Sequence, residues 1–129
     1  MKKQILNEFI SKSGKLVEIR IKNKPAFKIK RIFIITSKKN TKRGGHAHQK
    51  CNQILISLKT KFKIILNKKK KLIINSRDNE LIYVPKLNWV DLEFKEKDIV
   101  LVLCDRKYEK KDYIYDFNDL KKVKSHFKK

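Results

Sequence analysis

Acidic residues and cysteines are scarce in this chain, and no apolar run is long enough to cross a bilayer. The first residues, Met1-Lys2-Lys3-Gln4, also lead into no apolar stretch of the kind a signal peptide needs. The two cysteines, Cys51 and Cys104, lie far apart in apolar surroundings, which fits buried thiols in a reducing compartment. We therefore expect a cytoplasmic protein with no membrane segment.

Because a disulfide framework is not expected, a hydrophobic core has to hold the fold. The chain has 129 residues, of which 40% are hydrophobic, and this is enough for one core without support from a metal. The sequence contains no linker and no internal repeat. We expect a single domain over residues 1–129.

Arginine is also scarce, although the formal net charge is +22. Only five of the 35 basic residues are arginine, and the 30 lysines are spread along the whole chain. Such a charge can indicate polyanion binding, but base readout and phosphate clamping favour arginine, and base stacking favours exposed aromatic residues. We therefore predict only non-specific affinity for polyanions at low salt, and no specific nucleic-acid partner.

Most of the sequence has the apolar pattern of short β-strands. The pattern predicts strands over residues 15–22, 27–35, 53–58, 62–66, 72–74, 81–84, 89–94 and 99–104. Residues 15–22 alternate and should be half-buried, 27–35 should end as a buried run, and 40–45 reads as a polar loop. Residues 53–58 and 62–66 are expected to form a hairpin around Lys59-Thr60-Lys61.

Only the tail, residues 117–127, has a helical pattern, so a fold that alternates strands and helices is excluded. The prediction is one all-β domain, a sandwich or barrel, with a short C-terminal helix. A long N-terminal strand at the edge of such a barrel would need a cover, and dimerisation would provide one.

The segment Arg43-Gly44-Gly45-His46-Ala47-His48 carries the strongest chemical signal. In an extended chain, side chains two positions apart point to one face, so the imidazoles of His46 and His48 should project together while Ala47 points away. The glycines allow a sharp turn before the pair, and Arg43 offers a planar cation suited to phosphate. An isolated pair of strand histidines can simply hydrogen-bond, so the surrounding motif decides between the two interpretations.

The spacing resembles the first cupin motif, in which His-x-His and a later Glu line a small β-barrel and bind a metal. In this chain Gln53 stands at the Glu position, and the segment around Trp89 lacks the fourth ligand histidine. The remaining histidine, His126, lies in the tail. Two imidazoles alone make a weak site, so we predict no metal and no other cofactor.

Four further segments make the resemblance specific. Together with the histidine segment, they resemble the dTDP-4-keto-6-deoxyglucose 3,4-ketoisomerases. The matching segments are residues 29–35, 43–48 and 53–58, then Val84-Pro85-Lys86-Leu87-Asn88-Trp89, and finally residues 101–114 with their Tyr-x-x-x-Asp-Tyr-Ile ending. The resemblance runs from about residue 14 to residue 120. It implies a metal-independent cupin or jelly-roll barrel and a homodimer that exchanges N-terminal strands.

The resemblance also implies the reaction, in which a ketone moves from C4 to C3 of a dTDP-linked 6-deoxyhexose through an enediol. The 3-keto product then precedes transamination to a 3-amino sugar of surface glycans. Histidine suits this proton transfer because its pKa lies near neutrality. We expect His46 to be the principal base and His48 its acid–base partner or an orienting group.

We expect the other predicted site residues to bind substrate. They are Arg43, for the diphosphate or the enediolate, and Arg31, Gln53, Trp89 and Phe33, for the pocket; Trp89 fits a core position as well. The family commonly has Tyr where this chain has Phe33, and Val90 replaces a frequent His or Arg. The alternatives are a non-catalytic cupin that binds a sugar nucleotide and a 3,5-epimerase, for which a His–Asp dyad and a tyrosine acid would be needed.

Overall fold

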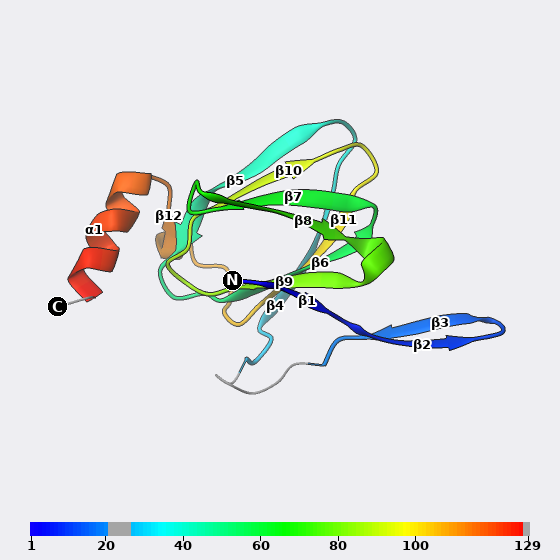
Figure 1. The fold of residues 1–129 in the computed structure, drawn as a ribbon. Coiled ribbons are helices and arrows are strands. Elements are labelled where there is room, and N and C mark those ends of the chain that lie inside the picture. The colour runs from blue at the N-terminus through cyan, green and yellow to red at the C-terminus, as the bar shows by residue number, and fades with distance from the viewer. Residues whose placement is uncertain (21–26, 128–129) are drawn as a thin grey trace.

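The computed structural model describes residues 1–20 and 27–127, and its strands form two facing antiparallel sheets (Figure 1). The first sheet has the order β1 (Lys3–Ile5), β9 (Glu80–Val84), β6 (Gln53–Lys59), β11 (Ile99–Cys104) and β4 (Arg31–Thr36). The second has the order β12 (Tyr113–Ile114), β5 (Thr41–His48), β10 (Val90–Phe94), β7 (Lys61–Leu66) and β8 (Lys70–Asn75). This is the predicted all-β jelly-roll architecture.

A hairpin, two short turns and one helix lie outside the two sheets. A hairpin of β2 (Asn7–Ser11) and β3 (Gly14–Glu18) projects away from the two sheets (Figure 1). Short 3-10 turns cover Ser76–Asp78 and Lys110–Asp112, and α1 (Phe117–Phe127) is the predicted C-terminal helix. The helix is neither long enough nor apolar enough to cross a membrane, and it is the only α-helix in the described part of the chain.

The main core fills the space between the two sheets. The side chains of β7 alternate between buried and more exposed, and Phe62, Ile64 and Leu66 on its inner face are almost completely buried. They pack against Leu55 and Val102 of the opposite sheet. Burial of apolar surface at about 25 cal/mol per Å² makes this core the main source of stability, as expected for a domain whose two thiols are free.

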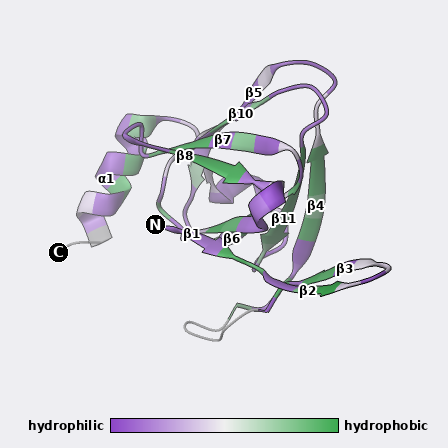
Figure 2. Cartoon of the chain, turned by 45° about the vertical axis from the view of Figure 1, so that its right-hand side comes forward, coloured by the Kyte–Doolittle hydropathy of each residue, from purple (hydrophilic) through white to green (hydrophobic). Residues whose placement is uncertain are grey.

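The outer face of the first sheet carries a second apolar cluster. Ile56 and Leu103 are covered there by Leu6 and Phe27. Toward the edge strand β4 the cover ends, and Ile32 and Ile34 are 57% and 58% exposed. The prediction that residues 27–35 end in a buried run was therefore wrong: β4 alternates, with its outer apolar side chains uncovered, and Figure 2 shows these hydrophobic segments on β4.

The predicted strands over 53–58 and 62–66 exist, but their predicted pairing was wrong. β6 pairs with β9 and β11 in the first sheet, whereas β7 pairs with β8 and β10 in the second. A single residue, Thr60, joins them with a φ of 61°, and the chain crosses there from one sheet to the other. The sequence around Thr60 resembles that of a hairpin because a chain that crosses between two sheets also needs a tight turn between two apolar strands.

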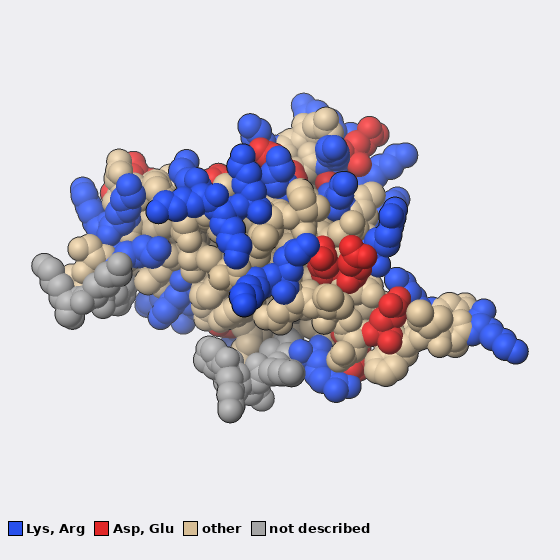
Figure 3. Space-filling model, viewed as in Figure 1, with Lys and Arg blue, Asp and Glu red and all other residues tan. Residues whose placement is uncertain are grey.

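Two other local predictions were also wrong. The N-terminal segment is an exposed hairpin and not one half-buried strand, because β3 has no partner besides β2 among the described residues; residues 21 and 22 lie outside them. The predicted polar loop at 40–45 belongs mostly to β5. Figure 3 shows lysine and arginine side chains scattered over the viewed face, as the spread of lysines along the sequence predicted.

Candidate active site

A cavity of about 450 Å³ opens between the two sheets. Its apolar walls are formed by side chains of β4, β6, β10 and β11, including Leu55, Leu92 and Val102. The polar and aromatic lining comes from four strands and includes Arg31, Phe33, Arg43, His46, Gln53 and Tyr113. An apolar enclosure with a few converging polar groups is the usual form of a small-molecule site.

The two glycines shape β5 just before the histidines. Gly44 and Gly45 have φ values of +87° and +71°, and the register with β10 shifts at this point, so that one extra residue bulges out of the ladder. A side chain on Gly44 would place its Cβ 2.5 Å from the Val90 carbonyl oxygen. The bulge thus requires glycine, and it sets the direction in which His46 enters the cavity.

His46 and His48 project on the same side of β5, as predicted. Their rings meet edge to face with centroids 5.1 Å apart. Ala47 between them is fully buried on the other side, where it packs against Trp89 and Leu120 of α1. The helix therefore backs the strand that carries the histidine pair.

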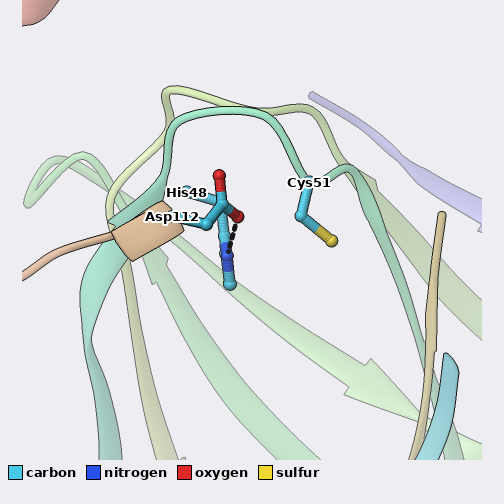
Figure 4. Close-up of side chains that lie close together, drawn as sticks. All are labelled: His48, Cys51 and Asp112. Atoms are coloured by element: carbon cyan, nitrogen blue, oxygen red, sulfur yellow. Dashed lines mark hydrogen bonds and ion pairs between the residues drawn. The ribbon is translucent and has the colours of Figure 1, made fainter. Parts of the chain in front are cut away.

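Only His46 of the pair lines the cavity; His48 lies behind it and is 8% exposed. The Nδ1 of His48 lies 2.9 Å from Oδ2 of Asp112 (Figure 4). The other carboxylate oxygen accepts a hydrogen bond of 2.7 Å from the Lys50 backbone N–H. Because an ionised carboxylate only accepts, the proton is on Nδ1 of His48, and Nε2 is an acceptor. This Nε2 is buried without a hydrogen-bond partner among the described residues.

The same corner contains one grouping with metal-ligand atoms. His48, Cys51 and Asp112 have ligand atoms within 4.8 Å of one another (Figure 4). The His48 and Asp112 atoms are engaged with each other, and the Cys51 thiol donates to the Asn52 carbonyl oxygen at 3.4 Å. The carboxylate also serves a backbone N–H, so the arrangement is a hydrogen-bonded dyad beside a buried thiol.

Burial lowers the pKa of both strand histidines below the usual value. For His46 the neighbouring His48 lowers the pKa further, whereas a hydrogen bond to the Gly44 backbone and the charge of Asp91 oppose the shift. For His48 the hydrogen bond and charge of Asp112 oppose the effect of burial without overcoming it. Both imidazoles are therefore neutral at pH 7, and His46 is ready to accept a proton.

The lowered pKa values of His46 and His48 predict that the free energy of unfolding decreases as the pH is lowered below about 6.5, the pKa of an unfolded histidine. Since the folded pKa values are lowered, the unfolded chain binds more protons in this range, and each histidine contributes at most about 1.4 kcal/mol per pH unit. Urea unfolding of the native chain and of a His46→Asn variant at pH 7 and 5.5 measures the effect. We expect a smaller loss for the variant; an equal loss would contradict the neutral state of His46.

The remaining predicted binding residues are placed around the cavity. The guanidinium of Arg31 lies over the Phe33 ring at 4.6 Å and over the Tyr108 ring at 5.2 Å. Arg43 is exposed at the cavity rim. Gln53 is buried, and its amide donates to Sγ of Cys104 at 3.4 Å.

Trp89 is the exception, since it is not among the described residues that line the cavity. It is buried against Ala47 and Phe117, and its indole N–H donates to Oδ2 of Asp91 at 3.1 Å. The sequence allowed Trp89 to be either a pocket residue or a core residue, and in the structure it is a core residue. The indole supports the back of β5 and does not reach into the cavity.

Sequence reasoning missed two residues that the fold brings to the histidines. Asp112 and Tyr113 are not among the predicted site residues, although both belong to the Tyr-x-x-x-Asp-Tyr-Ile ending. Residues 113 and 114 pair with 48 and 47 as β12, so Asp112 reaches His48 and the Tyr113 ring lies 4.9 Å from that of His46. The signal that could have found them is this ending itself, since it is one of the motifs that carry the family resemblance.

Comparison with known proteins gives a consistent result over nearly the whole chain. Residues 1–125 match the family model described as "FdtA: WxcM-like, C-terminal". The chain is 29% identical over 128 residues to the TDP-4-oxo-6-deoxy-alpha-D-glucose-3,4-oxoisomerase of Aneurinibacillus thermoaerophilus, a match that covers 95% of this chain and 92% of the relative.

Two solved structures are similar in fold as well as in sequence. A 3,4-ketoisomerase from Helicobacter canadensis superposes with a TM-score of 0.84 at 29% identity, covering 95% of this chain and 96% of the other. The sugar 3,4-ketoisomerase QdtA from Thermoanaerobacterium thermosaccharolyticum, solved in complex with TDP, gives 0.83 at 31% identity, with 98% and 96% covered.

Proposed function

The chain belongs to the FdtA family, and from this membership and the form of its cavity we infer that it is a 3,4-ketoisomerase of TDP-linked keto sugars. The observation that carries the inference is a neutral histidine, His46, presented to a largely apolar cavity in a fold shared with such enzymes. The substrate we propose is TDP-4-keto-6-deoxyglucose. The product has its ketone at C3, the group that a transaminase would need to place an amine there.

The chemistry follows from the acidity of a hydrogen next to a carbonyl group. With the ketone at C4, a neutral imidazole can remove the hydrogen at C3 and later return a proton to C4. We assign this role to His46. His48, whose Nδ1–H is held by Asp112, supports the His46 ring from behind and keeps an unprotonated nitrogen beside it.

Two arginines fit the anionic parts of the substrate. Arg43 at the rim suits the diphosphate, because a planar guanidinium can bind two phosphate oxygens at once. Arg31 lies deeper and suits the oxygen that gains negative charge as the enediol forms. Gln53 and Phe33 complete the pocket wall beside Arg31.

The 3,5-epimerase alternative needs reconsideration because the structure contains a His–Asp dyad. The dyad histidine is His48, which is behind the cavity wall, whereas the histidine in the cavity, His46, has no carboxylate hydrogen bond among the described residues. A 3,5-epimerase would need the dyad histidine to reach the sugar carbons. The geometry therefore favours the ketoisomerase.

Incubation of the protein with TDP-4-keto-6-deoxyglucose in D₂O tests the proposal. We expect a C3 ketone in the NMR spectrum, with any deuterium at C4. Deuterium at C3 and C5 with the ketone still at C4 would identify an epimerase. Saturable binding of the substrate without any exchange would identify a sugar-nucleotide-binding protein.

We further propose that the protein is a homodimer that exchanges N-terminal strands. The β2–β3 hairpin carries Phe9 and Leu16 opposite each other, 54% and 59% exposed. A two-stranded hairpin has little stability alone, and a second copy would cover these side chains together with Ile32 and Ile34 of β4. The free buried thiols also suit a reducing compartment, so we place this dimer in the cytoplasm.

A double variant Phe9→Asp/Leu16→Asp should weaken the dimer, because charged side chains would be buried in its interface. Sedimentation velocity should show the native chain as a dimer and the variant shifted to the monomer at the same concentration. Ser13→Asp at the hairpin tip is the matched control and should stay dimeric. A monomeric native chain would contradict the proposal.

A further inference from the structure

Moving a ketone from C4 to C3 requires proton transfers at oxygen as well as at carbon. The C4 oxygen must gain a proton when the enediol forms, and the C3 hydroxyl must lose one when the new ketone forms. His46 serves the carbon atoms in the proposed function, on which this inference rests. A second group, acidic and close to His46, is therefore needed for the oxygens.

Tyr113 has a position that meets this need. It is the one phenol among the described residues that line the cavity. β12 holds it directly opposite His48 in the ladder, and its ring centroid lies 4.9 Å from that of His46. The imidazole and the phenol therefore border the same part of the cavity.

The hydroxyl of Tyr113 also has a charged neighbour. The Nη1 of Arg31 donates to the Tyr113 oxygen at 3.5 Å, and the same guanidinium is held over the rings of Phe33 and Tyr108. A phenolate formed during the reaction would thus be next to a fixed positive charge. Burial raises the pKa of Tyr113, and Arg31 only partly opposes the shift, so the resting group is a protonated donor.

We propose that Tyr113 is a catalytic residue that exchanges a proton with the sugar oxygens while His46 exchanges one with the carbons. As His46 takes the C3 hydrogen as a proton, the C3–H electrons form the C3=C4 bond, and the C4 oxygen takes the proton of Tyr113. The C3 hydroxyl then returns a proton to the Tyr113 phenolate, and C4 takes the proton held by His46. Both residues end as they began, and no oxidant is needed.

The variant Tyr113→Phe removes one oxygen atom and keeps the ring. We expect kcat to fall by about a hundredfold or more, within the range typical of acid–base groups, while KM and TDP affinity change less than about threefold. Tyr115→Phe is the matched control, since Tyr115 is 65% exposed, stacks on the Tyr113 ring at 5.7 Å and is outside the described cavity lining. A kcat within about threefold of the native value in Tyr113→Phe would overturn the proposal.

A second experiment keeps the hydroxyl and changes only its acidity. Replacing Tyr113 by 3-fluorotyrosine should move the alkaline limb of the kcat/KM profile to lower pH, because the phenol becomes more acidic; an unmoved limb would overturn the proposal. A purely structural hydroxyl would not move it. If the native chain forms no C3 ketone, the proposed function fails, whereas an active native chain with an equally active Tyr113→Phe variant overturns this inference alone.

Discussion

Replacement of His46 by Asn is expected to lower kcat by about a thousandfold, with the affinity for TDP nearly unchanged. His46 is the histidine that lines the cavity, and its lowered pKa keeps it neutral and able to take the C3 hydrogen. Asparagine fills a similar volume but cannot accept and return a proton at neutral pH. Steady-state kinetics by NMR and TDP titration by calorimetry measure the two quantities separately.

The matched control for this substitution is His126→Asn. His126 is an exposed residue of α1 that does not belong to the described cavity lining, and its replacement should leave kcat within about twofold of the native value. Exchange of the C3 hydrogen with solvent at the native rate in His46→Asn would exclude His46 as the base. The proposed function would then survive only with another base.

Replacement of Asp112 by Asn is expected to have the second largest effect, on stability and on activity together. Asp112 accepts from His48 Nδ1 and from the Lys50 N–H, and both the carboxylate and the imidazole are buried. The two donors contact different carboxylate oxygens, and in Asn one of these positions is an NH₂ group, so one buried donor loses its acceptor at a cost of about 2 kcal/mol. Urea unfolding at pH 7 measures this loss.

The effect of Asp112→Asn on catalysis is expected to be about tenfold to a hundredfold in kcat, because His48 loses the partner that fixes its tautomer and its ring beside His46. Asp119→Asn, at an exposed site in the first turn of α1, is the control for loss of one carboxylate. If Asp112→Asn lost stability but kept native kcat, Asp112 would hold the fold alone and His48 would have no part in positioning the base.

Local sequence predicted most strands and the direction of the histidines, because both depend on a period of two along an extended chain. The buried strand at 99–104, the strand at 89–94 and the C-terminal helix were confirmed as β11, β10 and α1 within a residue or two. The shared side of His46 and His48 was also confirmed by the contact of their rings. These features involve residues that are neighbours in the chain.

Pairings between distant segments could not be predicted in the same way. The single-residue connection at Thr60 has the local pattern of a hairpin, yet β6 and β7 belong to different sheets. The uncovered face of β4 likewise depends on what packs over it, and alternation alone does not reveal that. Sheet order is set by the packing of the whole core.

The sequence by itself determined an all-β domain, a histidine pair on one strand face and the family to which the motifs point. Only the tertiary structure decided that His46 faces the cavity while His48 is behind it, that Trp89 supports the core, and that Asp112 and Tyr113 reach the histidines. The physical reason is that a side chain's direction follows from its own strand, whereas its neighbours follow from strand pairing. Asp112 and His48 are 64 residues apart in the chain, and only the pairing of β12 with β5 brings them together.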